Sequence, residues 1–206
     1  MKKPLLSNIP QDQASEADGD RRGADRYRTV WRIAKVKRDG DVGLWRVRNM
    51  SDRGMMLAAD VPITVGEALE VTLSDTVTVR GKVVWSEGGR CGVEFDKEVD
   101  VAEVLKQLAA EQRASGYRQP RLPVHTRAQL VTDEGTSEIE LVDLSQSGAG
   151  YVHGHLLEVG KEVDLVLASG IRRKAIVRWS KGGRGGLWLT QPLDRADLES
   201  IHRFQN

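Results

Sequence analysis

The sequence predicts a mainly β protein, built as two tandem six-stranded antiparallel β-barrels that are each followed by a C-terminal α-helix. Short runs rich in β-branched and aromatic residues alternate with Gly, Asp and Asn turns along most of the 206 residues. Turn signals of the hairpin type recur between these runs. The chain also matches itself at an offset of about 94 residues, which indicates that one small domain has been duplicated.

The internal repeat is clearest in two pairs of segments. Residues 83–92 read VVWSEGGRCG, and residues 177–186 read VRWSKGGRGG. Residues 49–54 read NMSDRG, and residues 143–148 read DLSQSG. Since each copy has about the length of a small domain, two similar domains account for the chain better than one large domain does.

The chain begins with a polar stretch, residues 1–20, which has almost nothing to bury and is expected to be a disordered arm. About six strand-forming runs follow in each copy. Closing them into a barrel removes the exposed edges that such short strands would otherwise leave. The expected hairpin connections are RDGD at 38–41, SEGG at 86–89, TDEG at 132–135 and SKGG at 180–183.

Each copy ends on a helix signal. In the first copy Asp100 is the expected N-cap, and Glu103 follows three residues later. In the second copy Asp194 is the expected cap of a shorter helix. The residues expected to face inward are Val101, Val104, Leu105 and Leu108 in the first helix, and Leu198, Ile201 and Phe204 in the second.

These elements divide the chain into an arm at residues 1–20, a first domain at 21–115 and a second domain at 116–206. The linker at 114–120 is short, so we expect the two barrels to touch.

Composition limits the function classes. Lys and Arg number 31 against 30 Asp and Glu, and this near-neutral balance argues against a long polyanion such as duplex DNA as the main partner. The sequence has no apolar run of membrane-spanning length and no signal peptide, so we expect a cytoplasmic protein without a membrane span. The single cysteine, Cys91, is read as a small buried residue, and the sequence offers no zinc ligand set, so we expect no metal.

The NMSDRG segment predicts a polar corner. In a strand Asn49 and Ser51 share one face, whereas Met50 points to the other. Gly54 would permit a turn that a larger residue resists, including one with positive φ. Taken alone, the motif also fits a turn that is stabilised by its own Asn and Ser side chains.

Arginines precede this corner. Arg22 and Arg26 lie four residues apart, where the polar arm would enter the first strand. Such a run is often only a solvated face. Guanidinium groups, however, grip phosphate bidentately and stack on bases, so arginines opposite a polar corner suit a compact dianionic purine ligand.

RGADR at 22–26 followed by NMSDRG at 49–54 resembles the RxxxR and [D/N]xSxxG signature of PilZ domains, the bacterial receptors for cyclic di-GMP. The resemblance covers residues 21–114 and, more loosely, 117–204. It implies PilZ-like barrels, cyclic di-GMP as the ligand, no catalytic residues, no other cofactor, and a downstream protein partner that no motif names. The implied ligand-binding residues are Arg21, Arg22, Arg26, Asn49, Ser51 and Gly54.

The second copy departs from this signature. Arg121 aligns with Arg26, but Tyr117 aligns with Arg22, and Arg118 leaves a spacer of two residues instead of three. We therefore expect this copy to keep the fold and to bind the ligand weakly or not at all. Its weaker site would consist of Arg118, Arg121, Asp143, Ser145 and Gly148.

The sequence also bears on three other functions. A hydrolase built on Ser145 lacks a strand-to-helix elbow. A small-barrel RNA-binding protein would fit the EGGR and KGGRGG runs, but aromatic residues are few and the repeated Trp85 and Trp179 are read as core. An interaction scaffold that binds no ligand is the third reading, and the oligomeric state stays open.

Overall fold

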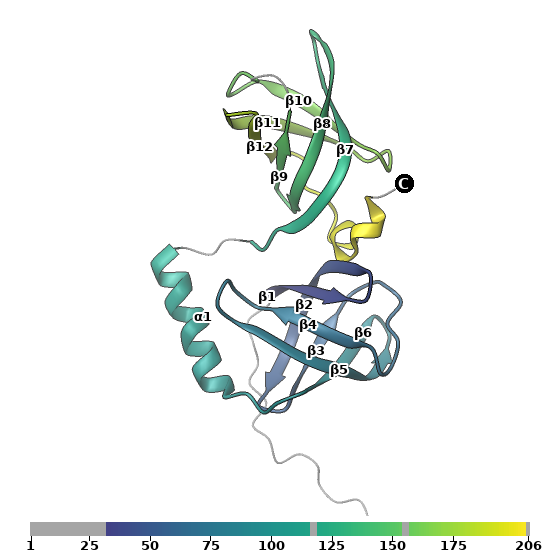
Figure 1. The fold of residues 1–206 in the computed structure, drawn as a ribbon, viewed down its shortest axis with the longest axis vertical. Coiled ribbons are helices and arrows are strands. Elements are labelled where there is room, and N and C mark those ends of the chain that lie inside the picture. Colours follow the sequence, from purple (N-terminus) through teal and green to yellow (C-terminus); the bar gives the residue numbers. More distant parts are fainter. Residues whose placement is uncertain (1–31, 116–118, 154–156, 205–206) are drawn as a thin grey trace, which may run out of the picture.

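The computed structural model describes residues 32–115, 119–153 and 157–204. The first domain is a closed barrel with the strand order β1-β2-β3-β6-β5-β4 (Figure 1). Helix α1 (Val101–Ser115) follows it along one side. The strands are β1 (Arg32–Arg38), β2 (Asp41–Ser51), β3 (Gly54–Ala58), β4 (Ala68–Thr72), β5 (Thr78–Glu87) and β6 (Arg90–Phe95).

The second domain repeats this barrel with the order β10-β11-β12-β9-β8-β7. Every pair of neighbouring strands in both barrels is antiparallel, which confirms the predicted fold class. The strands are β7 (Leu122–Thr132), β8 (Gly135–Ser145), β9 (Gly148–Val152), β10 (Glu162–Leu167), β11 (Arg172–Lys181) and β12 (Arg184–Leu189).

The four predicted hairpins are confirmed. Two-residue turns join β1 to β2, β5 to β6, β7 to β8 and β11 to β12. In the β5–β6 turn Gly88 and Gly89 have φ of 55° and 69°, and in the β11–β12 turn Gly182 and Gly183 have φ of 58° and 74°. Two successive positive φ angles define the turn type whose twist matches that of the strands, which explains the glycine pairs.

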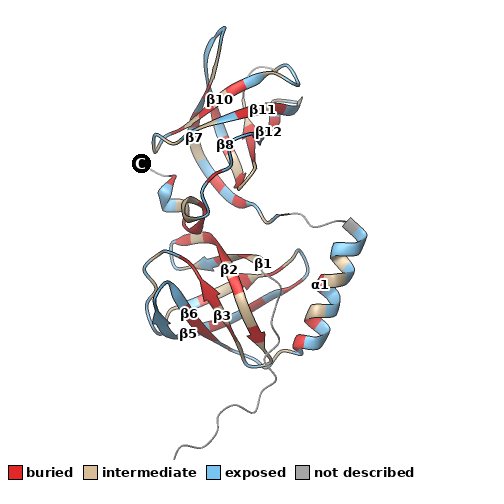
Figure 2. Cartoon of the chain, turned by 180° about the vertical axis from the view of Figure 1, so that it is seen from behind, coloured by how far each residue is buried: buried red, intermediate tan, exposed pale blue. Residues whose placement is uncertain are grey.

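Each barrel is filled by its own inward side chains. Residues alternate between buried and exposed along most strands, as the banded colours of Figure 2 show. Cys91 is fully buried in the first core, as expected, and burial raises the pKa of its thiol to about 11. In the second core Tyr151 fills the space beside Gly185, where a Cβ would lie 2.1 Å from the Tyr151 ring.

The first C-terminal helix agrees with its prediction. The Asp100 carboxylate accepts a hydrogen bond from the Glu103 backbone N–H at 2.9 Å, which is an N-cap contact. Val101, Val104 and Leu108 are buried against the first core. The amphipathic pattern therefore located this helix correctly.

The α-helix expected after the second barrel is wrong in type. Two short 3-10 helices form instead, η1 (Ala196–Glu199) and η2 (Ile201–Arg203). Ser200 separates them because its backbone is extended and its hydroxyl accepts a hydrogen bond from the His202 N–H. Leu198 and Phe204 are nevertheless buried, as the pattern predicted.

The expectation that Trp85 and Trp179 belong to the cores is also wrong. Their exposed fractions are 42% and 49%. The strand register shifts between Val83 and Trp85, and likewise between Val177 and Trp179. Each β-bulge inserts one residue, so strict alternation from the buried valine fails and the tryptophan turns outward.

The two barrels touch, as the short linker predicted. Leu44 on β2 is buried and, together with Ile33 and Val42, packs against the apolar core of the second domain. The C-terminal segment, residues 193–204, lies between the barrels (yellow in Figure 1). The first domain thus contributes side chains to the second hydrophobic core.

Polar contacts fix this interface. The Trp45 indole N–H donates to the Glu199 carbonyl oxygen at 2.8 Å. The Asp41 carboxylate accepts hydrogen bonds from the Ser200 hydroxyl at 3.0 Å and from the Ile201 N–H at 3.1 Å. Because buried polar groups are costly to leave unpaired, these contacts select one arrangement of the barrels.

Glu199 brings a buried carboxylate to the same interface. It accepts a hydrogen bond from the Asp60 N–H, while Arg203 donates to the Asp60 carbonyl oxygen at 2.8 Å. Burial raises the pKa of Glu199, although the Asp60 N–H and the nearby Arg46 act in the opposite direction. No helix in the described part of the chain is long and apolar enough to cross a bilayer.

Candidate functional site

The predicted polar corner lies on the outside of the first barrel, where β2 meets β3. A β-bulge between Val47 and Asn49 shifts the register of β2. Val47 and Met50 are therefore both buried, whereas Asn49 and Ser51 face outward. The predicted alternation from Asn49 to Ser51 is confirmed, and the bulge supplies the reason that Asn49 is on the outside.

Two rows of outward residues cross the strands at this corner. The register places Trp85, Gly92, Met56 and Asn49 in one row across β5, β6, β3 and β2. A Cβ on Gly92 would lie 1.9 Å from Trp85 Nε1, so the indole lies over this glycine. The neighbouring row contains Lys82, Glu94, Gly54 and Ser51.

The β2–β3 turn is held by its own motif residues. The Ser51 hydroxyl donates to the Gly54 carbonyl oxygen at 3.3 Å. Gly54 does not have a positive φ, so that explanation of the glycine is wrong. A Cβ at this position would lie 2.4 Å from the Val93 carbonyl oxygen, and the close approach of β6 is what requires glycine.

Two contacts of this turn were not predicted. Asp52 accepts a hydrogen bond from the Val101 N–H at 3.1 Å through its carboxylate and from the Val99 N–H at 2.8 Å through its carbonyl oxygen. The Arg53 carbonyl oxygen accepts from the Phe95 N–H at 2.9 Å. The corner is thus joined to the end of β6 and to the first turn of α1, a link with no signal in the NMSDRG motif itself.

The equivalent corner of the second barrel has the same framework. The Ser145 hydroxyl donates to the Gly148 carbonyl oxygen at 3.3 Å. A register shift between Leu141 and Asp143 again turns the motif residue outward. The turn is also tied to the barrel, because the Ser147 carbonyl oxygen accepts from the Leu189 N–H at 2.9 Å.

The two corners differ in how their first motif residue is engaged. Asp143 forms an ion pair with Arg121 at 2.5 Å and accepts a hydrogen bond from the Gly150 N–H at 3.1 Å. The Asn49 side chain forms no hydrogen bond with any residue in the described ranges. Among these residues the first corner therefore has an open amide, whereas the second corner is closed by its own arginine.

The remaining predicted site residues lie outside the described residues. They are Arg21, Arg22 and Arg26 of the first domain and Arg118 of the second. The structure therefore brings together Asn49, Ser51 and Gly54 in one corner, and Arg121, Asp143, Ser145 and Gly148 in the other.

Comparison with known protein families decides the classification. The model of the PilZ domain matches residues 20–111 and again residues 112–205. The chain belongs to the PilZ family. Its two barrels are therefore tandem PilZ domains, as the signature resemblance implied.

Several solved structures resemble this PilZ protein. PlzA of Borreliella burgdorferi in complex with c-di-GMP is 13% identical, with a TM-score of 0.36, over 85% of this chain and 88% of PlzA. MotI of Bacillus subtilis, an inhibitor of motility, is 14% identical, with a TM-score of 0.34, over 81% and 91%. YcgR of Escherichia coli in complex with c-di-GMP is 11% identical, with a TM-score of 0.31, over 76% and 75%. No curated protein matches.

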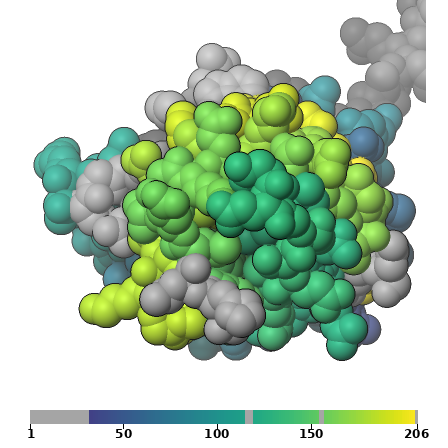
Figure 3. Space-filling view, turned by 90° about the horizontal axis from the view of Figure 1, so that it is seen from above, coloured from purple at the N-terminus to yellow at the C-terminus, as the bar shows by residue number. Residues whose placement is uncertain are grey.

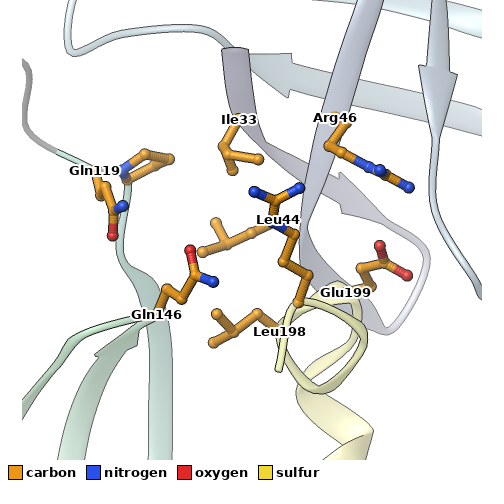
Figure 4. Close-up of a pocket in the computed structure, with 9 residues that line it drawn as sticks. Ile33, Leu44, Arg46, Gln119, Gln146, Leu198 and Glu199 are labelled. Atoms are coloured by element: carbon orange, nitrogen blue, oxygen red, sulfur yellow. The ribbon is translucent and has the colours of Figure 1, made fainter. Parts of the chain in front are cut away.

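A crevice also lies between the two PilZ domains (Figure 4). Apolar side chains of Ile33, Leu44 and Leu198 line it, with Arg46 and Glu199 at one side. Its volume of about 30 Å³ is room for about one water molecule, so it is too small for a nucleotide. The polar corners on the outside of the barrels are the better candidate sites.

Proposed function

We propose that this PilZ protein is a cytoplasmic, non-enzymatic receptor that binds cyclic di-GMP through its first PilZ domain. Arg22 and Arg26 grip the phosphates and stack on guanine, with Arg21 assisting. Asn49 and Ser51 form hydrogen bonds with the guanine edge and phosphate groups, because an amide both donates and accepts. Gly54 keeps the corner open.

The open Asn49 amide is the observation that supports binding by the first domain. It lies on a strand whose turn is held by Ser51, β6 and α1, so the corner is ordered before a ligand arrives. In the second domain Arg121 already neutralises Asp143. A ligand phosphate would have to displace that ion pair, which lowers affinity.

The serine geometry supports a receptor rather than an enzyme. Both Ser51 and Ser145 donate their hydroxyl proton to a glycine carbonyl oxygen in the same turn. This contact stabilises a turn, whereas a nucleophilic serine would donate to a general base.

In the proposed relay, the ligand bridges the arginine arm, the segment that carries Arg21, Arg22 and Arg26, to the first corner. The corner contacts α1 through Asp52, and α1 leads into the second domain. Closing the arm would then bias α1 and the inter-barrel surface toward a state that a downstream protein recognises, since a ligand shifts an equilibrium through its differential contacts.

Calorimetric titration of cyclic di-GMP into the intact chain tests the proposal, with GTP as a competitor. We expect saturable binding that Arg22→Ala weakens about 30-fold, because a lost charge-assisted contact costs about 2 kcal/mol. Arg118→Ala is the matched control in the second domain and should bind normally. Absence of binding to the intact chain would contradict the receptor and favour an interaction scaffold.

A further inference from the structure

The outer surface of β11 and β12 carries two exposed tryptophans among cations. We define it by six residues that all face solvent: Lys174, Arg178, Trp179, Lys181, Arg184 and Trp188. It belongs to the second barrel, whose green and lime surface faces the viewer in Figure 3. This tryptophan face adjoins the motif corner of the second barrel, since Trp188 lies opposite Gly148 and Trp179 lies in the same row as Asp143. It has no role in the proposed ligand site of the first domain.

Both indoles are placed there by the barrel itself. The bulge in β11 turns Trp179 outward over Gly186, where a Cβ would lie 2.1 Å from the indole nitrogen. Trp188 is opposite Gly148 on β9, which has no side chain to cover it, and it is 46% exposed. The Arg178 guanidinium lies 5.7 Å from the Trp188 ring centroid. Large aromatic surfaces kept in water at fixed positions indicate an interaction site.

The cations of this face are available to a partner. Lys174, Arg178, Lys181 and Arg184 form no salt bridge with any other described residue. The ion pairs that β11 forms with described residues use its two neighbouring arginines: Arg172 pairs with Asp164 at 4.0 Å, and Arg173 pairs with Asp194 at 3.3 Å and with Asp197 at 3.6 Å. An anion can therefore contact these four cations without breaking an existing salt bridge.

The first barrel provides an internal comparison. Its residues at the same barrel positions are Glu94 in place of Trp188, Val84 in place of Arg178, and Glu87 in place of Lys181. Across the outward positions of β10, β11 and β12, the second barrel has five cations and two carboxylates, whereas β4, β5 and β6 of the first barrel have three of each. The first barrel has Trp85, Arg80 and Arg90 at the positions of Trp179, Lys174 and Arg184. What the second barrel adds is a second exposed tryptophan, Trp188, and the cations Arg178 and Lys181, which the fold itself does not require.

We propose that the tryptophan face binds single-stranded nucleic acid. Bases stack on Trp188 and Trp179, and the flanking Lys and Arg side chains contact the phosphates. The stacking of an exposed indole requires a free base face, which a single strand offers and a duplex does not. The buried position expected for Trp179 argued against nucleic acid, and its outward position removes that objection.

The anisotropy of a fluorescein-labelled oligonucleotide of about 15 thymidines or uridines, titrated with the intact chain, tests this inference. Four phosphate contacts predict that affinity falls about 50-fold between about 50 and 200 mM salt. The protein should bind a blunt duplex of the same length more weakly. Absence of binding at the lower salt concentration would overturn the proposal.

Variants then locate the site. Trp188→Ala should weaken binding at least about fivefold, because base stacking on one aromatic side chain contributes that much or more. Glu94→Ala, at the same position of the first barrel, is the matched control and should leave binding unchanged. Lys181→Glu with Arg184→Glu changes only solvent-facing side chains next to the hairpin turn, and it should weaken binding and flatten the salt dependence. Equal affinity in all of these variants would overturn the assignment.

An acidic protein segment is the competing partner. A polyglutamate peptide of similar length, added as competitor, should displace the oligonucleotide only weakly, since it has no bases to stack. Binding of the peptide as tight as that of the oligonucleotide, with equal sensitivity to Trp188→Ala, would overturn the nucleic-acid proposal in favour of an acidic partner.

Discussion

Because Gly54 has no side chain, strands β3 and β6 can approach each other closely at this position. A Cβ there would lie 2.4 Å from the Val93 carbonyl oxygen, closer than packed atoms approach. At the equivalent Gly148 the nearest carbonyl oxygen, that of Leu187, would be 3.2 Å away. The same motif glycine is thus more tightly constrained in the first domain, where the open corner lies.

Replacing Gly54 by alanine should therefore lower the free energy of unfolding by about 1–3 kcal/mol, because the extra methyl group overpacks the corner. Urea denaturation followed by circular dichroism measures this change. Gly148→Ala is the control and should lower the free energy of unfolding by a smaller amount. Equal losses in the two variants would show that the backbone conformation, and not the close approach of β6, requires the glycine.

Glu199 is a residue whose charge works against the folded state. Burial raises its pKa above the ordinary value of 4.5, so the folded chain holds this proton more tightly than the unfolded chain does. The stability that Glu199 contributes is present below the unfolded pKa and is lost as pH rises through the folded pKa. Glu199→Gln should remove this dependence.

Denaturation midpoints between about pH 4 and pH 7 test this linkage. As pH rises, the denaturation midpoint of Glu199→Gln should increase relative to the midpoint of the parent chain. Glu138→Gln, on an exposed side chain of β8, serves as control. Parallel profiles for Glu199→Gln and the parent would contradict the role assigned to the buried carboxylate.

Residue-level prediction succeeded where strand alternation is uninterrupted and failed where a bulge intervenes. The spacing of two between Asn49 and Ser51 placed both on one face correctly. Trp85 and Trp179 were read as core because they repeat between the two copies, and the sequence contains no local mark of the extra residue by which each bulge turns the tryptophan outward. Arg21, Arg22 and Arg26 lie outside the described residues, so their role stays a prediction.

At the scale of elements, the β2–β3 turn and helix α1 form one unit. Asp52 accepts hydrogen bonds from the N–H groups of Val99 and Val101, and Asp100 caps the same end of the helix. Removing the Asp52 carboxylate leaves the Val101 N–H without its partner. A change in the corner is therefore a change in the start of α1.

Asp52→Ala should cost about 0.5–2 kcal/mol of stability, as the loss of a helix-cap acceptor usually does. Hydrogen exchange should show faster exchange in the first turn of α1 while the strands of the second barrel stay protected. Asp75→Ala, on an exposed loop residue of the same barrel, is the control. Unchanged exchange in α1 would contradict the coupling between corner and helix.

Element types were largely predictable because hairpin turns and amphipathic helices depend on local chemistry. The glycine pairs at 88–89 and 182–183 require positive φ, and the sequence marked both turns. The second C-terminal helix was not predictable in type, since Ser200 uses its hydroxyl to accept from His202 N–H and to donate to Asp41, a residue of the other barrel. That second contact depends on tertiary structure alone.

At the scale of the whole molecule, Gly43 is where the backbones of the two domains come into close contact. A Cβ at this position would lie 1.9 Å from the Glu199 carbonyl oxygen, which belongs to the second domain. Linker length predicted that the barrels touch. It could not identify the surfaces, because the β2 side chain Leu44 reads from sequence as an ordinary core residue of its own barrel.

Gly43→Ala should separate the domains while both barrels stay folded, because its methyl group collides with backbone that cannot rotate away. Small-angle X-ray scattering should record a larger radius of gyration. Gly81→Ala is the matched control, since its Cβ would meet the Glu94 carbonyl oxygen at 2.2 Å within the first barrel. It should lower stability without changing the distance between the barrels. Unchanged scattering for Gly43→Ala would contradict the interface.

The central claim is that the first PilZ domain binds cyclic di-GMP through its open corner while the second corner is closed. Calorimetric titration of Asn49→Ala and Asp143→Ala, a matched pair at equivalent positions, tests it most directly. We expect Asn49→Ala to weaken binding by about tenfold, the effect of losing about one or two hydrogen bonds, and Asp143→Ala to bind like the parent chain. Loss of binding in Asp143→Ala with normal binding in Asn49→Ala would contradict the account.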